Sequence, residues 1–308
     1  MSKKIDVDKQ VAEARAGSRR ATARLLTALE SDSEQVPHIT AATAGGNAKV
    51  IGLTGSPGVG KSTLTSALIS AWRAQGLRVA VLAVDPSSPF SGGAILGDRV
   101  RMADHALDDG VYIRSVATRG HLGGLAATTG ASVRLLEGLG FDVVIVETVG
   151  VGQAEVEIAS LADTTLLLLA PGMGDAIQAV KAGVVEIADV YVVNKADRPG
   201  ADATVRDMRA MMSLVRREAG EWRQPIVKTQ AEDAGGIDEL TAEIDNHREW
   251  LIKHDRLAAM RRHRAWAEIR AAVDDRLRHH YRVGDDLAAQ LADGDIDVYA
   301  AVRKVLDD

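Results

Sequence analysis

The sequence predicts an α/β protein built on a mostly parallel, doubly wound sheet. Short apolar runs rich in Val, Ile and Leu recur between about residues 49 and 229, and helical stretches separate them. Such runs are typical of strands covered on both faces, and their alternation with helices is typical of parallel sheets. A glycine-rich segment, residues 55–62, joins the first run to the first helical stretch. This order of strand, loop and helix is that of a P-loop fold.

Seven runs are expected to form the strands of the sheet. In chain order they are VIGLTG, RVAVLAVD, VYIRSV, DVVIVET, TTLLLLAP, VYVVNK and PIVKT. We place them in a central domain, residues 47–245, between a helical N-terminal extension, residues 1–46, and a helical C-terminal arm, residues 246–308. A Gly-Gly pair punctuates the chain just before the first strand, and the alternation of strands and helices stops where the arm begins.

The composition excludes several classes of protein. The 308 residues allow one large domain with appendages or two domains, and 46% hydrophobic with 26% charged residues excludes a disordered or fibrous chain. A formal net charge of -6 gives little support to a general binder of nucleic acid or membranes. The chain has no cysteine, which excludes disulfides, thiolate metal sites and a cysteine nucleophile. Since neither a secretory signal nor a run of about 18 apolar residues occurs, we expect a cytoplasmic protein.

The C-terminal arm carries one apolar stripe on a basic helix. The stripe residues are spaced 3, 4, 4 and 4 apart, which places them on one helix face; they are Trp266, Ile269, Val273, Leu277 and Tyr281. This face packs either on the chain's own core or on a second copy of the chain, and both remain open. The nine Lys or Arg residues between positions 253 and 282 are interleaved with four acids, which favours a solvated helix face over a nucleic-acid arm.

Residues 55–62, GSPGVGKS, match the phosphate-loop pattern GxxxxGK[ST]. Glycines let successive backbone N–H groups curl around phosphates, and the following helix adds the positive end of its dipole. Lys61 is expected to reach the β- and γ-phosphates, and the Ser62 hydroxyl to ligate Mg²⁺. The residues expected to hold the phosphates are Gly55, Pro57, Gly58, Val59, Gly60, Lys61, Ser62 and Thr63.

The strand VYVVNK leads into Asn194-Lys195-Ala196-Asp197, an NKxD motif. The Asp197 carboxylate can accept two hydrogen bonds from the N1–H and the exocyclic amine of guanine, whereas adenine offers no such pair of donors. Lys195 is expected to lie along the base, and Asn194 to tie the neighbouring segments together. A later segment that includes Thr229, Gln230 and Ala231 could place backbone amides against the guanine oxygen. The expected ligands are therefore GTP and GDP with Mg²⁺.

Three carboxylates lie between these motifs: Asp85, Asp98 and Glu147. Asp85 and Glu147 end strands, and the carboxyl ends of parallel strands are where open α/β sheets bind ligands. Mg²⁺ takes only one or two protein oxygens in such sites, so we do not expect all three acids to bind it directly. Acids that cap the next helix are the alternative interpretation.

A glutamine that orients the attacking water usually follows the glycine of the DxxG motif directly. Here Glu147 stands in place of that aspartate, and Gln153 lies three residues beyond Gly150. We therefore expect slow intrinsic hydrolysis of GTP that becomes faster when a partner orders the loops.

Six segments in this order resemble the methylmalonyl-CoA mutase-associated GTPases, the bacterial MeaB/ArgK family with its human relative MMAA. They are GSPGVGKS, VDPSSPFSGGAILGDRVRM, ATRGHLGG, ETVGVGQAE, PGMGDAIQAVKAG and VVNKAD. The match covers roughly residues 50–240, and Glu147 in place of Asp agrees with that family.

The resemblance implies a homodimeric GTPase of the signal-recognition/MinD/BioD (SIMIBI) class, with the C-terminal helices as the dimerisation arm. It implies a G-protein chaperone that gates cofactor loading of an adenosylcobalamin-dependent mutase, methylmalonyl-CoA mutase, and protects that client. Carried over by position, Lys61, Asp98 and Glu147 are catalytic, and Ser62, Asp85, Asp98 and Glu147 form the metal cluster. The implied switch residues are Gly150, Gln153, Asp175, Gln178 and Lys181.

The same residues bear on other possible functions. A nickel-inserting GTPase usually carries Cys or His clusters, and this chain has no Cys and eight scattered His. A transport-associated ATPase or kinase for basic amino acids would use ATP, which Asp197 disfavours. A structural or nucleic-acid-binding module leaves the intact phosphate loop unexplained.

Overall fold

The computed structural model describes residues 5–31, 34–85, 105, 107–117, 124–148, 154–172, 187–214, 220–281 and 283–307. The strands form one seven-stranded sheet in the order β3-β2-β4-β1-β5-β6-β7, and every pair of neighbours is parallel. Each predicted run forms a strand: β1 Lys49–Thr54, β2 Val79–Asp85, β3 Val111–Ala117, β4 Val143–Thr148, β5 Thr164–Leu169, β6 Val190–Val193 and β7 Ile226–Lys228. The predicted parallel, doubly wound sheet is therefore confirmed.

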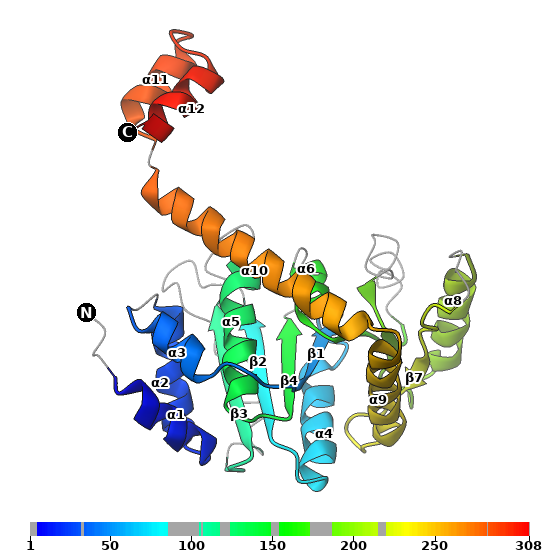
Figure 1. Ribbon diagram of the computed structural model, residues 1–308. Helices are drawn as coiled ribbons and strands as arrows, with labels where there is room; N and C mark the ends of the chain where they lie inside the picture. Colours follow the sequence, from blue (N-terminus) through cyan, green and yellow to red (C-terminus); the bar gives the residue numbers. More distant parts are fainter. Residues whose placement is uncertain are drawn as a thin grey trace.

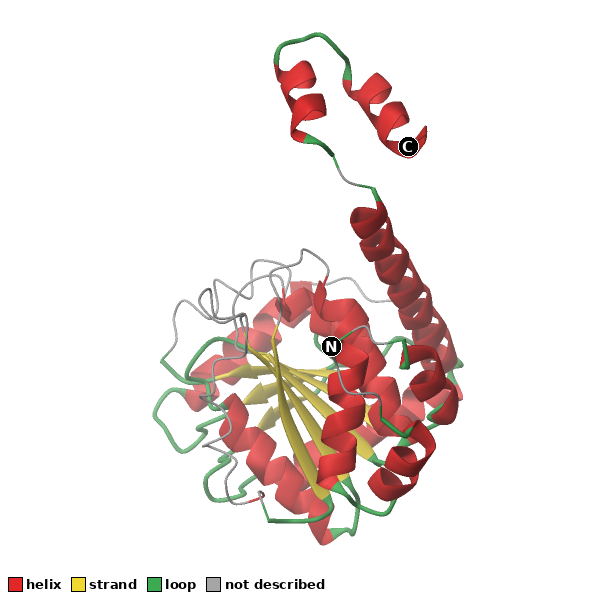
Figure 2. Ribbon diagram, turned by 90° about the vertical axis from the view of Figure 1, so that its left-hand side faces the viewer, coloured by secondary structure: helices red, strands yellow, loops and turns green. Residues whose placement is uncertain are grey.

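Helices cover both faces of the sheet (Figure 2). Those that precede or alternate with the strands are α1 Val7–Arg15, α2 Arg19–Glu30, α3 Val36–Ala42, α4 Lys61–Ala74, α5 Gly124–Gly138, α6 Ala154–Leu161, α8 Ala201–Leu214 and α9 Ile237–Lys253. The chain then continues into α10 Arg256–His280, α11 Asp285–Ala292 and α12 Val298–Asp307.

The two faces of the sheet contribute to separate cores because side chains alternate along each strand. On one face, residues such as Ile51 and Ile145 pack with Leu64 and Leu68 of α4 and with Leu240 of α9. The opposite face joins residues of β1, β2 and β4 to the N-terminal helices, α5 and α6. Burying a large aliphatic side chain contributes about 1.5–3 kcal/mol each, so both layers stabilise the sheet.

The N-terminal helices belong to this second core. Leu25 and Leu26 of α2 are completely buried. Two arginines fasten the ends of these helices: Arg15 donates to the carbonyls of Gly138 and Ala42, and Arg78 donates to those of Ala14 and Leu139 among others. Carbonyls at helix C-termini have no partner within the helix, so these bonds satisfy groups that would otherwise be costly to bury.

Helix α10 lies along α5 and is fixed to the body by a buried group of charges, which we call the Asp163 hub. The Asp163 carboxylate accepts hydrogen bonds from Arg261 at 2.7 Å and Arg264 at 2.9 Å, both on α10, and from Arg248 of α9 at 3.4 Å. Asp163 directly precedes β5, so the hub joins the start of a central strand to the arm. Further along α10, Glu268 pairs with Arg134 of α5.

Beyond Glu268, α10 runs past the body, and α11 and α12 pack on one another away from the sheet (Figure 1). The stripe residues Trp266, Ile269, Val273 and Leu277 are 46% to 67% exposed, so the chain's own core does not cover this face. Among the helices of the described residues, none has both the length and the apolar character needed to span a bilayer.

Candidate functional site

The segment between β1 and α4 forms a loop that requires glycine at fixed positions. Gly55 has φ 145° and Gly60 has φ 97°, conformations that residues with a Cβ rarely adopt. A Cβ on Gly55 would lie 2.4 Å from the carbonyl oxygen of Leu168, and one on Gly60 would lie 2.4 Å from Nδ2 of Asn194. Backbone from β5 and a side chain from the end of β6 therefore press directly on the loop.

The loop ends at the N-terminus of α4, where Gly60 is the N-cap and no side chain caps the helix. The first turn of a helix presents backbone N–H groups and the positive end of the dipole, which suits an anion. Lys61 begins α4, and its ammonium group donates to the carbonyls of Gly55 at 2.7 Å and Ser56 at 3.1 Å. The lysine side chain thus reaches back from the end of the loop to its start.

Asn194 connects the loop to two later segments. Its Nδ2 donates to the carbonyl of Val59 at 2.9 Å, while its Oδ1 accepts from the hydroxyl of Thr229 at 3.0 Å and the backbone N–H of Ala231 at 3.3 Å. Asn194 is 1% exposed, and all these bonds are buried. One side chain therefore brings the GxxxxGK[ST] loop, the NKxD motif and the segment after β7 together, as the sequence predicted for Asn194.

Lys195 of the NKxD motif also contacts the loop. Lys195 has φ 56°, an uncommon backbone conformation for a residue other than glycine, and its ammonium group donates to the carbonyl of Gly58 at 2.7 Å. Asp197 follows on an exposed turn, and within the described residues its carboxylate has no hydrogen-bond partner. Gln230 pairs with Gly235 in a short bridge that shapes the turn after β7.

Glu147 lies on the face of β4 that α4 covers and is 3% exposed. Its Oε1 accepts from the Ser62 hydroxyl and its Oε2 from the Thr65 hydroxyl, each at 2.8 Å. The sequence prediction placed Ser62 and Glu147 together but missed Thr65. The available signal was its position three residues after Ser62, which puts both hydroxyls on one face of α4.

Other predicted site residues are placed only in part. Val59 is buried in the core, Pro57 and Gly58 are exposed on the loop, and Thr63 lies in the first turn of α4. Asp85 ends β2, one residue beyond the Val84–Thr148 pair with β4, and its side chain is outside the described part of the chain. The remaining predicted residues also lie outside it: Asp98, Gly150, Gln153, Asp175, Gln178 and Lys181.

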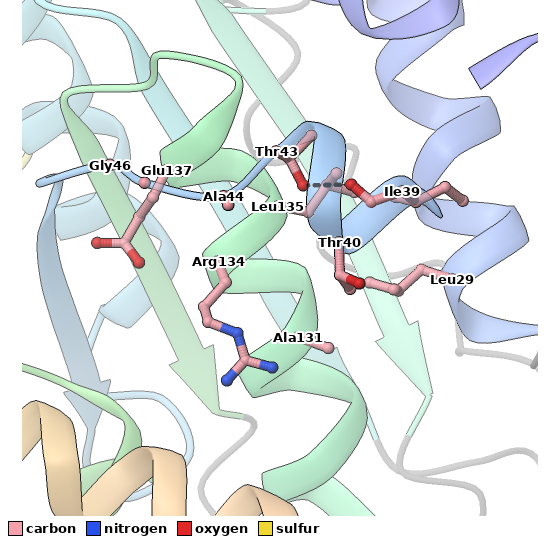
Figure 3. Close-up of a pocket in the computed structure, with 11 residues that line it drawn as sticks. Leu29, Ile39, Thr40, Thr43, Ala44, Gly46, Ala131, Arg134, Leu135 and Glu137 are labelled. Atoms are coloured by element: carbon pink, nitrogen blue, oxygen red, sulfur yellow. Dashed lines mark hydrogen bonds between the residues drawn. The ribbon is translucent and has the colours of Figure 1, made fainter. Parts of the chain in front are cut away.

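A cavity of about 310 Å³ lies elsewhere, between α3, the segment before β1 and the C-terminal half of α5 (Figure 3). Leu29, Ile39 and Leu135 give it apolar walls, and Arg134 and Glu137 project beside it. Burial raises the pKa of Glu137. The cavity adjoins the N-terminal end of β1, whereas the glycine-rich loop follows the C-terminal end of that strand. The cavity and the loop therefore lie at opposite ends of the strands.

Within the described residues, two groups with strongly shifted pKa values also lie at the ends of the strands opposite the loop. Burial raises the pKa of Asp189, just before β6, to about 7, and lowers the pKa of His247 on α9 to about 4. The His247 Nε2 lies 3.4 Å from the Asp189 carboxylate, and its Nδ1 is 2.9 Å from the Thr164 hydroxyl. Trp222 donates to the Asp189 carbonyl and packs against the His247 ring. This pair joins α9 to the sheet.

Comparison with known proteins agrees with this geometry. The family model for the methylmalonyl-CoA mutase-associated GTPase MeaB matches residues 22–286. A GTPase homologue from Pyrococcus abyssi is 45% identical over 311 residues, covering 97% of this chain and 96% of its own. The GTPase ArgK from Escherichia coli is 39% identical over 244 residues, covering 78% of this chain and 74% of its own.

A solved structure, that of an LAO/AO transport system kinase, superposes with a TM-score of 0.74 and 27% identity over 99% of both chains. The prediction of a SIMIBI-class P-loop GTPase fold is thus confirmed, as is the resemblance drawn from the sequence motifs. The chain belongs to the family of methylmalonyl-CoA mutase-associated GTPases, MeaB.

Proposed function

We propose that this protein binds GTP at the loop between β1 and α4, hydrolyses it with Mg²⁺, and uses the cycle to assist an adenosylcobalamin-dependent acyl-CoA mutase. The observation that carries the nucleotide part is the set of three buried hydrogen bonds made by Asn194. They support the proposal because they tie the segment that carries the exposed Asp197 to a loop whose shape and helix dipole suit a triphosphate.

The residues present fit a magnesium ion. Mg²⁺ prefers oxygen ligands and keeps several waters, so one hydroxyl and one nearby carboxylate are a typical protein contribution. Ser62 and Glu147 supply this pair at the N-terminus of α4, and their 2.8 Å hydrogen bond already joins them. In the proposal Ser62 ligates the ion, and Glu147, together with Asp85 and Asp98, acts directly or through water. Bound Mg²⁺ would neutralise charge that develops on the phosphates.

The chain's own part in hydrolysis is positioning. The backbone N–H groups of the loop and the Lys61 ammonium would bind the β- and γ-phosphates, and Lys61 would leave the carbonyls of Gly55 and Ser56 to do so. The reaction is transfer of the γ-phosphoryl group to water, without a covalent intermediate. Because Gln153 is displaced from the usual position after Gly150, turnover by the isolated protein is expected to be slow.

The choice of nucleotide is tested by binding. Calorimetry should detect heat of binding when GTP or GDP is titrated into the protein. The affinity for ATP in the same experiment should be much lower. Asp197→Asn replaces one acceptor oxygen with a donor, so it should lower affinity for GTP about tenfold or more without improving that for ATP by a similar factor. Equal affinity for the two nucleotides would instead support the transport-associated ATPase or kinase.

The proposed client follows from the family. Members are described as mutase-associated, and the match extends over residues 22–286, beyond the nucleotide site into both sets of flanking helices. The segment that includes Asp175, Gln178 and Lys181 is the proposed switch toward the client. Co-purification with methylmalonyl-CoA mutase in the presence of a non-hydrolysable GTP analogue tests this, with a second acyl-CoA mutase as the control. If only the second mutase is recovered, the proposed GTP hydrolysis stands, and the second mutase replaces methylmalonyl-CoA mutase as the proposed client.

A homodimer is part of the proposal because the arm leaves its apolar stripe exposed. Four large apolar residues on one helix face form a surface that monomeric proteins usually cover. A second copy of the same stripe is a self-complementary partner, as a two-fold interface requires. Sedimentation or light scattering should therefore give twice the mass of one chain.

A further inference from the structure

Glu147 is held at two points by a single helix. Its Oε1 accepts from Ser62 and its Oε2 from Thr65, and both O···O distances are 2.8 Å. All three side chains are buried, with exposed fractions of 3% for Glu147, 6% for Ser62 and 0% for Thr65. Buried polar groups are usually hydrogen-bonded, and these two bonds hold both oxygens of the carboxylate against α4.

The hydrogen bond from Thr65 restricts a rotation of the Glu147 carboxylate that the bond from Ser62 alone would allow. The terminal torsion of a glutamate side chain is broad, so a carboxylate bonded through one oxygen can still turn about its last C–C bond. A second donor on the other oxygen fixes the plane of the group.

The length of the side chain matters for the same reason. An aspartate at position 147 would carry its carboxylate nearer the strand by about one C–C bond, roughly 1.5 Å. A bond of 2.8 Å has no slack of that size, so a shorter acid on the same backbone could not reach both hydroxyls. The glutamate that replaces the more common aspartate therefore matches a helix that offers a hydroxyl at position 65 as well as at position 62.

From this geometry we propose that Thr65 is a positioning residue for the magnesium site: by holding Oε2 of Glu147 it orients the carboxylate toward the ion bound at Ser62. The inference rests on the proposed function, since it assumes that Mg²⁺ binds there with the nucleotide. Thr65 itself touches neither the ion nor GTP. It lies one turn further along α4, behind the hydroxyl that does.

The test measures Mg²⁺ binding to the protein–GDP complex, a readout that does not depend on turnover. Thr65→Val removes the hydroxyl and nearly preserves shape, so the Mg²⁺ concentration for half-saturation should rise about tenfold, the size expected for a hydrogen bond to a charged group. Affinity for GDP in EDTA should stay within about twofold of the wild type, because the loop and the base contacts are unchanged. Thr65→Ser keeps the hydroxyl and should restore Mg²⁺ binding.

Glu147→Ala provides the matched second arm, because it removes the carboxylate that accepts from Thr65. It should weaken Mg²⁺ binding, and adding Thr65→Val to it should have little further effect, since the bond between the two residues is already lost. If Thr65→Val does not fold, as judged by circular dichroism, Thr65→Ala takes its place in the same cycle.

Two results would overturn the inference. One is a Mg²⁺ titration of Thr65→Val that matches the wild type. The other is an equal loss of GDP affinity with and without Mg²⁺, which would mean that Thr65 only packs α4. If the wild-type protein gives no heat with GDP, the proposed function itself is wrong. If GDP binding to the wild type does not depend on Mg²⁺, the proposed metal site is wrong. Both results differ from those that would contradict the role of Thr65.

Discussion

The Asn194 side chain donates to the carbonyl of Val59 at 2.9 Å, across 135 positions of sequence. This contact fixes the distance between the phosphate-binding loop and the segment that is proposed to bind the base. The same amide accepts from Thr229 and Ala231, so three segments depend on one side chain.

Replacing Asn194 with Asp should keep the acceptor but lose the Nδ2 donor to Val59. We expect GTP and GDP affinity to fall about tenfold or more, and the free energy of unfolding to fall by about 1–3 kcal/mol, because a buried carbonyl loses its partner. Calorimetry and urea denaturation measure the two effects. Thr229→Val is the comparison, since it removes one donor to the same side chain without touching the loop. If the two variants bind GDP equally well, the contact with Val59 is not what positions the loop.

Gly60→Ala should abolish nucleotide binding through a specific collision. The new Cβ would lie 2.4 Å from Nδ2 of Asn194, in addition to the strain of alanine at φ 97°. Gly76→Ala is a matched control, because Gly76 has φ 80° but nothing within 4 Å of a Cβ. Both variants should lose about 1–2 kcal/mol of stability from backbone strain, and only Gly60→Ala should lose GDP binding in a fluorescence titration.

Asp163→Asn should loosen the attachment of α10. The arginines of the hub would face a neutral amide, and breaking a buried ion pair costs about 3–5 kcal/mol. Thermal unfolding should report this loss. Asp202→Asn removes an ion pair with Lys228 in which the two side chains are 78% and 53% exposed, and it should cost no more than about 1 kcal/mol. A loss for Asp163→Asn as small as that control would show that the hub does not anchor the arm.

The Asp189–His247 pair predicts a particular dependence on pH. The folded pKa of Asp189 is raised to about 7, so the stability it contributes is present below its unfolded pKa and is lost as pH rises toward 7. The folded pKa of His247 is lowered to about 4, so its contribution is present above the unfolded pKa and is lost as pH falls from about 6.5 to 4. Between these limits the two effects oppose each other, and the wild-type curve should be nearly flat.

Asp189→Asn removes one of the two effects. Asparagine can still accept from the Thr165 backbone N–H and donate to His247, yet it cannot ionise. Relative to the wild type, the variant should gain about 1–2 kcal/mol between pH 5 and pH 8 in urea denaturation. A difference that does not change with pH would mean that Asp189 titrates in the folded protein as it does in the unfolded chain.

Adding charge to the apolar stripe should separate the proposed dimer. Ile269→Glu with Val273→Glu places two carboxylates in the middle of the exposed face, and burying them against a second copy would be costly. Analytical ultracentrifugation should then give the mass of a single chain. Calorimetry should give the same GDP affinity as for the wild type. Ala210→Glu, on the exposed face of α8, adds charge elsewhere and should leave the dimer intact. A dimer that survives the double substitution would place the interface on another surface.

The strands could be predicted from the sequence because each is a continuous apolar run, and a strand such as Thr164–Leu169 is buried at every position. The phosphate loop and the position of Glu147 at a strand end follow from short, local patterns. The order of the strands does not, since β4 lies between β1 and β2 through contacts distant in sequence.

Two features could not be seen in local patterns. Thr65 is an ordinary helix residue until the fold brings Glu147 to it from 82 positions away. The charged pattern of the first helices predicted an extension but did not show that Leu25 and Leu26 pack in the second core with α5, because an amphipathic helix gives no indication of which surface it will cover. For the same reason, the sequence left open whether the apolar stripe of α10 packs on the chain's own core or on a second copy of the chain.

The ammonium groups of Lys61 and Lys195 both donate to carbonyls of the glycine-rich loop, one to Gly55 and Ser56 and the other to Gly58. The curvature of the loop is thus held from two sides, by α4 and by the segment after β6. If Lys61 turns to the phosphates as proposed, the bond from Lys195 to Gly58 remains, so only part of the loop has to be reorganised when a nucleotide binds, and affinity should be set mainly by the dissociation rate.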